Sequence, residues 1–332
     1  MGALRRSLTA GYPNIDIDYV RPPAAFRGPI GKVIWEQLVW PARAGGRLAH
    51  VPYLAPPVFG SGGVVTAHDV IPLVLPEYAV GGRQAAYLAV IRSGLQRAKK
   101  VIADSDWTRR DLVRVGGISN DRIEVIPLGV DDRFCPGSQA QCMRARQRLG
   151  LPEEFALFLG TRDLRKNLGV VLSAWPEIWK ACGLSLVVAG RAPKVGSSVY
   201  VDWFTGLDES ASSWLRVIGP IAESDKPDLY RASKMFVFPS RYEGFGLDPL
   251  EAMASGVPVL VADCTSLPEV VGDAGLLLPP GDPVAWREAV CRVVQEPLLS
   301  SELHGKGLAR AAGFTWARTA ELTYSVYQGV GL

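Results

Sequence analysis

Long apolar stretches are missing from this sequence of 332 residues. A helix that crosses a bilayer needs about 20 consecutive apolar residues. The longest apolar runs here, at 184–189 and 257–262, are the length of buried strands. Residues 1–10 contain Arg5 and Arg6 but no apolar core after them, so we expect no signal peptide. We therefore expect a cytoplasmic protein without a membrane-spanning segment.

The sequence also lacks the clusters that hold a metal ion, a disulfide framework or a nucleic acid. It has no aspartate pair or histidine cluster at metal-ligand spacing, so we expect neither a metal nor another cofactor. Its five cysteines are scattered and odd in number, which is typical of thiols in a reducing compartment. No basic stripe with interleaved aromatic residues is present, so nucleic acid is not an expected partner.

The net charge of +3 is small, but it is unevenly distributed. Residues 1–135 carry 17 Lys and Arg against 12 Asp and Glu, whereas residues 136–332 carry 19 against 21. A basic first half favours contact with an anionic inner membrane surface or with a phosphorylated acceptor. A solvated surface with a small excess of positive charge accounts for the same numbers, and this alternative stays open.

Short apolar runs that alternate with helical patterns fill the rest of the chain. With 48% hydrophobic and 21% charged residues, the composition is that of a globular protein, and at roughly 150 residues per domain the length predicts two domains. In the second half we expect strands at 155–159, 184–189, 215–218, 235–238, 257–261 and 274–278. We expect helices between them at 169–180, 226–231, 249–254 and 283–295. This alternation indicates a doubly wound parallel sheet, which binds its ligands at the carboxyl ends of its strands.

The first half shows the same alternation less completely. Strands are expected at 64–67, 101–103 and 123–126, and helices at 82–97 and 108–115, with Thr108 or Asp106 as the cap of the second helix. The predicted parts are a first domain at 1–135, a connection at 136–150, a second domain at 151–314 and a C-terminal helix at 315–332. Two such domains that face one another would form a ligand-binding cleft.

The densest chemical signal lies at 238–254, FPSRYEGFGLDPLEAMA, which predicts a strand, a glycine-bearing loop and the start of a helix. Gly244 and Gly246 let the loop bend sharply and approach a ligand. Pro249 suits the first helical position, and the free N–H groups of a helix start form an anion site for a diphosphate. Glu243 and Glu251 could face one ligand from different sides. The spacing of Asp248 and Glu251 also fits a capping box, which is the structural alternative for Glu251.

A second element, GTRDLRKN at 160–167, also follows a strand and precedes a helix. Its Arg165 and Lys166 are suited to phosphate oxygens. Cations at a helix start are electrostatically unfavourable, which favours a phosphate partner over a merely solvated role. Two strand-end sites, one with cations and one with helix N–H groups, predict a bound nucleotide diphosphate whose charge is neutralised by protein groups.

Several segments in register give the chain a family resemblance. The segment EGFGLDPLEAMASGVPV, with Glu243 and Glu251 eight positions apart, resembles the signature of retaining GT-B glycosyltransferases of family 4, the group 1 family. The supporting segments are HDVIPL at 68–73, VIPLGVD at 125–131, GTRDLRKN at 160–167, FVFPS at 236–240 and SLPEVVGDAGLLLPPGD at 266–282. The resemblance implies the GT-B fold, in which two Rossmann-like doubly wound domains face a cleft.

The resemblance also implies roles for individual residues. Glu251 would bind the ribose hydroxyls, Glu243 would lie near the donor sugar, and Lys166 with Arg165 beside it would hold the diphosphate. The backbone of Gly244, Phe245, Gly246 and Leu247 would contact sugar hydroxyls and phosphate. His68 would reach the transferred sugar from the first domain, with Asp69 beside it on the acceptor side. Glu243, His68 and Lys166 are then the expected catalytic residues.

The implied reaction moves a mannose-, glucose- or GlcNAc-type sugar from a nucleotide-diphosphate sugar to an acceptor hydroxyl, with retention and without a metal. The acceptor would be a glycan, a lipid-linked molecule or a small molecule in polysaccharide or glycoconjugate biosynthesis. Residues 1–18 resemble an entry at the family's second or third strand, so we expect a first domain that lacks its first βα unit. A nucleotide-sugar-binding protein with impaired catalysis, an epimerase and a phosphorylase on the same fold remain open.

Overall fold

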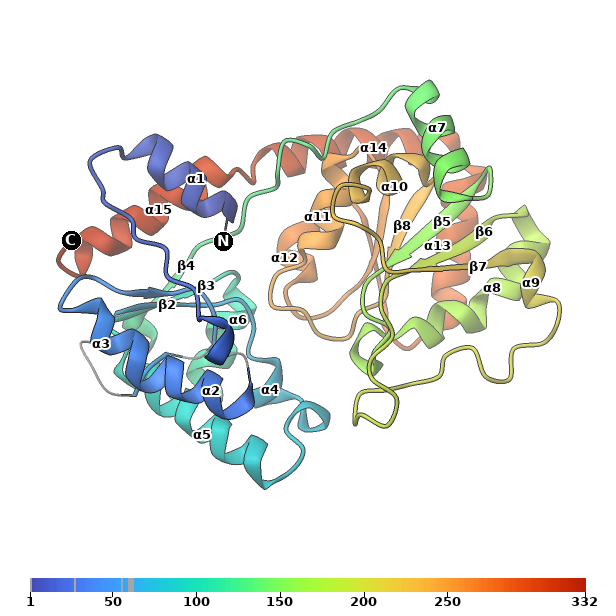
Figure 1. Ribbon diagram of the computed structural model, residues 1–332. Helices are drawn as coiled ribbons and strands as arrows, with labels where there is room; N and C mark the ends of the chain where they lie inside the picture. The colour runs from blue at the N-terminus through green and yellow to red at the C-terminus, as the bar shows by residue number, and fades with distance from the viewer. Residues whose placement is uncertain (1, 27, 55, 59–62) are drawn as a thin grey trace. The chain divides into compact units, whose positions relative to one another are not determined.

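A computed structural model describes residues 2–26, 28–54, 56–58 and 63–332. The chain forms two compact units, one of residues 1–129 with 315–332 and the other of residues 130–314 (Figure 1). The segment 136–150, which we expected as a connection, carries helix α7 (Gln139–Leu149) and lies in the second unit. The C-terminal helix α15 (Trp316–Gly329) belongs to the first unit.

The first unit is built on a parallel sheet whose strand order is β1-β2-β3-β4. The strands are β1 (His50–Val51), β2 (Val64–Ala67), β3 (Lys100–Ala103) and β4 (Ile123–Val125). Side chains alternate between the two faces of a strand. Val64 and Ile102 accordingly pack with α15, whereas Val65 and Val101 pack with residues of α5 (Gly82–Arg97) on the other face (Figure 1).

Short helices and turns complete the first unit. Its further helices are α1 (Gly2–Gly11), α2 (Pro29–Ile34), α3 (Trp40–Ala44), α4 (Ile71–Val74) and α6 (Asp106–Arg114). A π-helical turn, η2 (Trp35–Val39), joins α2 to α3. The 3₁₀ turns are η1 (Ala24–Phe26), η3 (Pro76–Tyr78) and η4 (Asn120–Arg122). The cap of α6 is Ser105, whose Oγ accepts a hydrogen bond from the backbone N–H of Thr108, so the predicted caps were wrong.

Residues 2–11 form a helix, and the expectation that 1–18 enters at a strand was therefore wrong where the structure describes it. Leu4 and Leu8 lie four residues apart and share one helical face. Both are buried in a cluster with residues of α15, and the rings of Tyr12 and Tyr324 stack beside it. This apolar face explains why a helix forms here.

The second unit is a six-stranded parallel sheet with the order β10-β9-β8-β5-β6-β7. The strands are β5 (Phe155–Leu159), β6 (Ser185–Ala189), β7 (Leu215–Gly219), β8 (Met235–Phe238), β9 (Val259–Ala262) and β10 (Leu276–Leu278). Every residue of β5, β8 and β9 is buried, as expected for central strands covered on both faces. This is the predicted doubly wound Rossmann-like arrangement.

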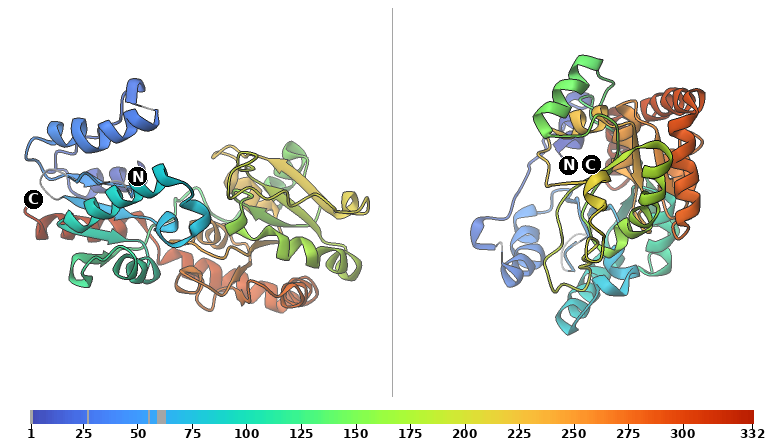
Figure 2. Two further views of the ribbon diagram at one scale, coloured as in Figure 1. Left: turned by 90° about the horizontal axis from the view of Figure 1, so that it is seen from below. Right: turned by 90° about the vertical axis from the view of Figure 1, so that its right-hand side faces the viewer.

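The helices of the second unit pack in pairs around this sheet. Besides α7 they are α8 (Leu168–Cys182), α9 (Ala211–Trp214), α10 (Lys226–Ala232), α11 (Leu247–Ala254), α12 (Leu267–Val271), α13 (Pro283–Gln295) and α14 (Pro297–Ala312). Helix α8 packs on α13, α11 on α14 and α10 on α7. Figure 2 shows α13 and α14, orange to red, along one side of the unit.

None of the described helices has both the length and the apolar composition that crossing a bilayer requires.

Candidate functional site

The strand order of the second unit places two loops at one point of the sheet. The chain runs outward from β5 through β6 to β7, and then from β8 through β9 to β10 on the other side. The order therefore reverses between β5 and β8, and open parallel sheets bind their ligands at such a switch point, outside the carboxyl ends of the strands. The 160–167 loop follows β5 and the 239–246 loop follows β8, so both predicted elements meet at this switch point.

Glu243 is the centre of the polar contacts between these loops. Its Oε1 accepts hydrogen bonds from Arg165 Nη1 at 2.6 Å and from Ser240 Oγ at 2.6 Å, and it lies 2.8 Å from Lys166 Nζ. Arg165 Nη1 also donates to the carbonyl oxygen of Tyr242 at 2.7 Å. The Lys166 ammonium lies 4.3 Å from the centre of the Phe238 ring. Two cations and one carboxylate are thus held together in a largely buried place.

The charge state of Glu243 follows from these neighbours. Burial raises the pKa of its carboxyl. The charges of Lys166 and Arg165, with the hydrogen bonds from Lys166 and Ser240, lower this pKa by a larger amount. The pKa of Glu243 ends below its ordinary value, and the side chain is a carboxylate at neutral pH. The buried cations therefore have a counter-ion in the protein, which the sequence did not reveal.

Glu251 occupies a second carboxylate position on α11. Its Oε2 lies 2.7 Å from Lys226 Nζ, and Tyr230 donates a hydrogen bond to the same oxygen at 3.4 Å. Asp248 lies between the two groups of charges, 3.7 Å from Lys166 Nζ and 3.6 Å from Lys226 Nζ. Burial raises the pKa of Glu251 to about 7, since the lowering effect of Lys226 does not offset burial and the charge of Asp248.

Helix α11 begins two residues earlier than predicted. Its N-cap is Gly246, whose φ of +117° lies in a region that favours glycine, and no side chain caps the helix start. Asp248 is the second helical residue and Pro249 the third, so the capping-box alternative and the first-position assignment of Pro249 were wrong. The uncapped N–H groups at this end are suited to an anion.

A third loop, after β9, supports the Glu243 segment. Thr265 Oγ1 accepts a hydrogen bond from the Glu243 N–H at 3.2 Å, and Ser266 Oγ donates to the carbonyls of Glu243 at 2.9 Å and Phe245 at 2.7 Å. Sequence reasoning missed these two residues as well as Ser240 and Lys226. Thr265 follows a buried strand, and Lys226 is a cation at a helix start, so both positions carried a usable signal.

The first unit places the remaining predicted site residues at the carboxyl edge of its own sheet. His68 follows β2, and its Nδ1 lies 2.6 Å from Oδ2 of Asp104, which follows β3. Asp69 Oδ1 accepts a hydrogen bond from the Ile71 N–H at 3.0 Å, so this carboxylate holds the turn into α4. His50, by contrast, has both ring nitrogens engaged, with Tyr327 Oη at 2.6 Å and Thr66 Oγ1 at 2.8 Å.

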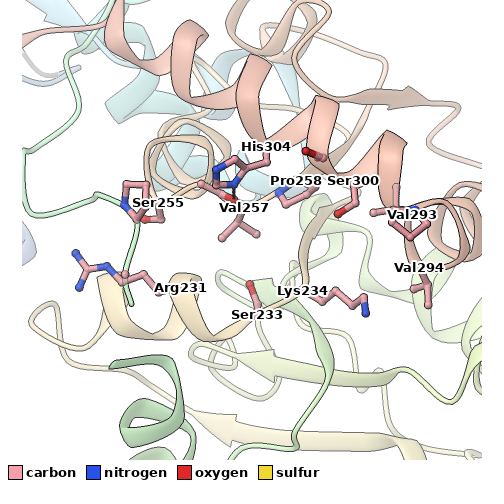
Figure 3. Close-up of a pocket in the computed structure, with 15 residues that line it drawn as sticks. Arg231, Ser233, Lys234, Ser255, Val257, Pro258, Val293, Val294, Ser300 and His304 are labelled. Carbon is pink, nitrogen blue, oxygen red and sulfur yellow. Dashed lines mark hydrogen bonds between the residues drawn. The ribbon is translucent and has the colours of Figure 1, made fainter. Parts of the chain in front are cut away.

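A cavity of about 480 Å³ lies at the opposite, amino-terminal edge of the second sheet (Figure 3). Three of its polar side chains already have protein partners. Arg231 bonds the carbonyls of Arg133 and Cys135, Lys234 pairs with Glu154, and His304 contacts the carbonyl of Gly256. Because these groups are engaged, the switch point remains the better candidate site.

Among the described residues, no group of three or more His, Cys, Asp or Glu side chains is arranged to hold a metal ion.

Two segments of the chain match models of known protein families. Residues 46–134 match the family model described as Glycosyltransferase Family 4, and residues 153–296 match the one described as Glycosyl transferases group 1. O-antigen chain mannosyltransferase B of Escherichia coli is 33% identical over 268 residues, which cover 80% of this chain and 70% of that protein. Alignment with the serotype-specific mannosyltransferase WbdA of the same organism covers 32% of the length of that protein, with 29% identity.

Solved structures share the fold. Sucrose-phosphate synthase from Thermosynechococcus elongatus superposes with a TM-score of 0.76 at 24% identity, covering 98% of this chain and 91% of that one. Anabaena HepE in complex with UDP-glucose superposes with a TM-score of 0.69 at 21% identity, covering 81% of this chain and 72% of that one. The family-model matches, the mannosyltransferase relative and these GT-B neighbours agree. This chain belongs to the group 1 glycosyltransferases of family 4 and has the GT-B fold of two Rossmann-like domains.

Proposed function

We propose that this chain transfers a hexose from a nucleotide-diphosphate sugar to an acceptor hydroxyl with retention of anomeric configuration. The observation that carries the proposal is the convergence of Arg165, Lys166 and Glu243 beside the start of α11. A nucleotide sugar presents a dianionic diphosphate between two sets of hydroxyl groups. Cations and helix N–H groups suit the diphosphate, and carboxylates suit the hydroxyls. The mannosyltransferase relative favours mannose as the sugar, with glucose- and GlcNAc-type sugars as the alternatives.

The diphosphate would be held by Lys166, Arg165 and the N–H groups at the start of α11. The two cations lie against a single carboxylate oxygen of Glu243. Phosphate oxygens would share these cations with Glu243. Positive charge fixed in advance where negative charge develops is the largest source of rate enhancement in many enzymes. Because protein groups supply this charge, the proposed reaction requires no metal ion.

The hydroxyl groups of the donor would be bound by the two glutamates and by the loop backbone. Glu251, with its carboxylate held by Lys226, would accept hydrogen bonds from the ribose. Glu243 would orient the donor sugar. The backbone at Gly244–Leu247 would contact sugar hydroxyls and phosphate. The contacts of Thr265 and Ser266 hold this loop in place, which supports a binding role for its backbone.

The reaction would replace one bond at the anomeric carbon by another on the same face. The bond from this carbon to the phosphate oxygen breaks, and the acceptor oxygen forms the new bond. The proton of the acceptor hydroxyl passes to the leaving phosphate oxygen. Lys166 and Arg165 would stabilise the charge on that phosphate, and His68 would contact the transferred sugar from the first unit.

The acceptor would be bound by the first unit, near His68 and Asp69. A glycan, a lipid-linked molecule and a small molecule are the candidate classes, and the relative's role in the O-antigen chain favours polysaccharide biosynthesis. A lipid-linked acceptor would require contact with a membrane surface. Ile30, Ile34 and Leu38 lie four residues apart along α2 and η2 and are exposed. Such an exposed apolar row in the basic half of the sequence supports peripheral contact with a cytoplasmic leaflet.

The test is a transfer assay with a panel of UDP-, GDP- and ADP-sugars, with NMR of the product. We expect melting temperature to rise with the matching donor, because a ligand that binds the native state stabilises it. With an acceptor present, we expect an α-linked product from an α-linked donor, and no loss of rate with a chelator. An inverted product contradicts retention. Binding without product indicates a nucleotide-sugar-binding protein, and conversion of the donor sugar without an acceptor indicates an epimerase.

A further inference from the structure

The contact between His68 and Asp104 follows from strand register in the first unit. Strands β2 and β3 are parallel neighbours, and Ala67 lies opposite Ala103. The next residue on each strand, His68 and Asp104, therefore leaves the sheet at the same edge. Their side chains meet with 2.6 Å between His68 Nδ1 and Asp104 Oδ2.

The carboxylate of Asp104 is almost fully buried, which is unusual for an aspartate. Its side chain is 1% exposed, whereas that of His68 is 39% exposed. The other oxygen, Oδ1, is buried and has no hydrogen-bond partner within the described part of the chain. A buried carboxylate with one partner destabilises a fold unless that partner compensates it. Asp104 does not cap α6, because Ser105 does so.

His68 differs from the buried His50 in the number of ring nitrogens that make hydrogen bonds. Both nitrogens of His50 are engaged, and burial with the nearby charge of His68 lowers its pKa to about 4. In His68 only Nδ1 is engaged, and Nε2 has no hydrogen-bond partner among the described residues. The ring is therefore fixed at one nitrogen and open at the other, as in a side chain that must present one atom to a ligand.

We infer that Asp104 is a positioning residue, which holds the proton of His68 on Nδ1 and leaves Nε2 open for a substrate group. This inference rests on the proposed function, in which His68 contacts the transferred sugar. Burial lowers the pKa of His68, but the hydrogen bond and charge of Asp104 raise it, and it ends above its ordinary value. A raised pKa favours the form of His68 that carries a second proton on Nε2, and this proton can be donated to a sugar hydroxyl or a phosphate oxygen.

The wild-type protein provides the first test. ¹⁵N spectra of histidine-labelled protein show only three side chains, and a His68→Gln variant assigns the resonance. We expect Nδ1 of His68 to stay protonated across its titration, while Nε2 is the nitrogen that gains and loses a proton. A neutral ring with its proton on Nε2 overturns the inference without any variant at Asp104.

The second test is Asp104→Asn, which keeps the size of the side chain and removes its charge. Because the amide can donate to Nδ1, we expect the neutral ring to shift toward the Nε2-protonated form. We expect kcat to fall by about 10- to 10²-fold with KM for the donor within about threefold, the pattern of a contact that matters mainly in the transition state. Unchanged tautomer and kcat in a folded variant contradict the inference.

The matched control is Asp111→Asn. Asp111 is another buried aspartate of the first unit, and its Oδ1 lies 2.7 Å from Arg114 Nη2. We expect this variant to lower stability while the His68 signal and kcat stay as in the wild type. If His68→Gln transfers sugar at the normal rate, the inference fails together with the proposed role of His68. If His68→Gln is impaired and Asp104→Asn is not, the inference alone fails.

Discussion

At the scale of single residues, the candidate site is defined by charges that compensate one another. Arg165, Glu243, Lys166, Asp248, Lys226 and Glu251 form one continuous chain of ion pairs at the edge of the second sheet. Buried ion pairs add little to stability, because desolvation offsets their attraction. The arrangement is therefore better explained by a charged ligand than by folding alone.

The first prediction concerns Lys166 and Glu243. We expect Lys166→Ala and Glu243→Gln each to lower kcat/KM by about 10²-fold or more, because the first removes a cation that stabilises the leaving diphosphate and the second removes a carboxylate that orients the donor sugar. Lys180→Ala is the matched control, because Lys180 is exposed on α8 and pairs with Glu177 on the same helix. Steady-state transfer assays measure the effect. Near-normal turnover in both site variants would refute the assignment of the donor site.

The second prediction concerns the pH dependence of donor binding through Glu251. Its pKa of about 7 in the free protein means that the carboxyl is partly protonated at neutral pH. Ribose hydroxyls donate to the carboxylate form, so binding should lower this pKa and release a proton. We therefore expect affinity to rise with pH up to a little above 7 and then level off.

Calorimetry with an intact nucleotide sugar in two buffers of different ionisation enthalpy measures this proton release. A nucleotide sugar is the right probe, because its diphosphate diester does not titrate near neutral pH. Glu251→Gln should bind more weakly and without the pH-dependent rise. Glu177→Gln, a change at an exposed carboxylate of α8, should keep the rise. A pH-independent affinity in the wild type would contradict the ribose-binding role of Glu251.

At the scale of elements, the site depends on how closely the ends of β5 and β6 approach. Gly190 follows β6 with a φ of +124°, and a Cβ at this position would overlap the carbonyl oxygen of Gly160 after β5. We predict that Gly190→Ala destabilises the protein by about 1–3 kcal/mol, and that it weakens donor binding because the 160–167 loop must move. Urea denaturation and calorimetry measure the two effects.

Gly305→Ala is the control for this change. Gly305 lies within α14, and nothing surrounds the position that a Cβ would take. Replacing a helical glycine at an open position should raise stability by about 0.4–1 kcal/mol, through the smaller entropy of the unfolded chain. Equal effects of the two substitutions would mean that the approach of Gly190 to Gly160 is not needed.

The elements were predictable where glycine or proline marks their ends. The strands Phe155–Leu159 and Met235–Phe238 and the helix Pro283–Gln295 have the predicted bounds. Helix α14 was not predicted, because Glu296 alone separates it from α13 and Pro297 suggests a stop rather than a start. Helix α1 was missed because only Leu4 and Leu8 mark its buried face.

For the candidate site, the meeting of its two loops was predictable, and the contacts between them were less so. Strand ends place loops at a sheet edge, and this is why the 160–167 and 239–246 loops were found together. The pairing of Arg165 with Glu243 joins residues 78 positions apart and depends on the reversal of strand order between β5 and β8. No local pattern contains that information, and the contacts of His68 with Asp104 depend on strand register in the same way.

At the scale of the whole molecule, the two units differ in what they offer a partner. The second unit contains the ion-pair chain of the candidate donor site, while the first half of the sequence carries the basic excess. The exposed row of Ile30, Ile34 and Leu38 also belongs to the first unit, on the helical segment that Figure 2 shows in blue. Because the basic excess and the exposed apolar row lie in the same unit, the proposed membrane contact is expected on that unit.

The last prediction tests this surface with lipid vesicles. We expect the protein to sediment with vesicles that contain phosphatidylglycerol and to release them as salt is raised, because screening weakens attraction between exposed charges. Ile30→Ser combined with Leu38→Ser should reduce binding, since these side chains are 78% and 60% exposed and free to enter the interface. Leu298→Ser removes an apolar side chain that is 87% exposed in the second unit, and it should leave binding unchanged. Equal binding by all three proteins would show that the row in the first unit is not the membrane contact.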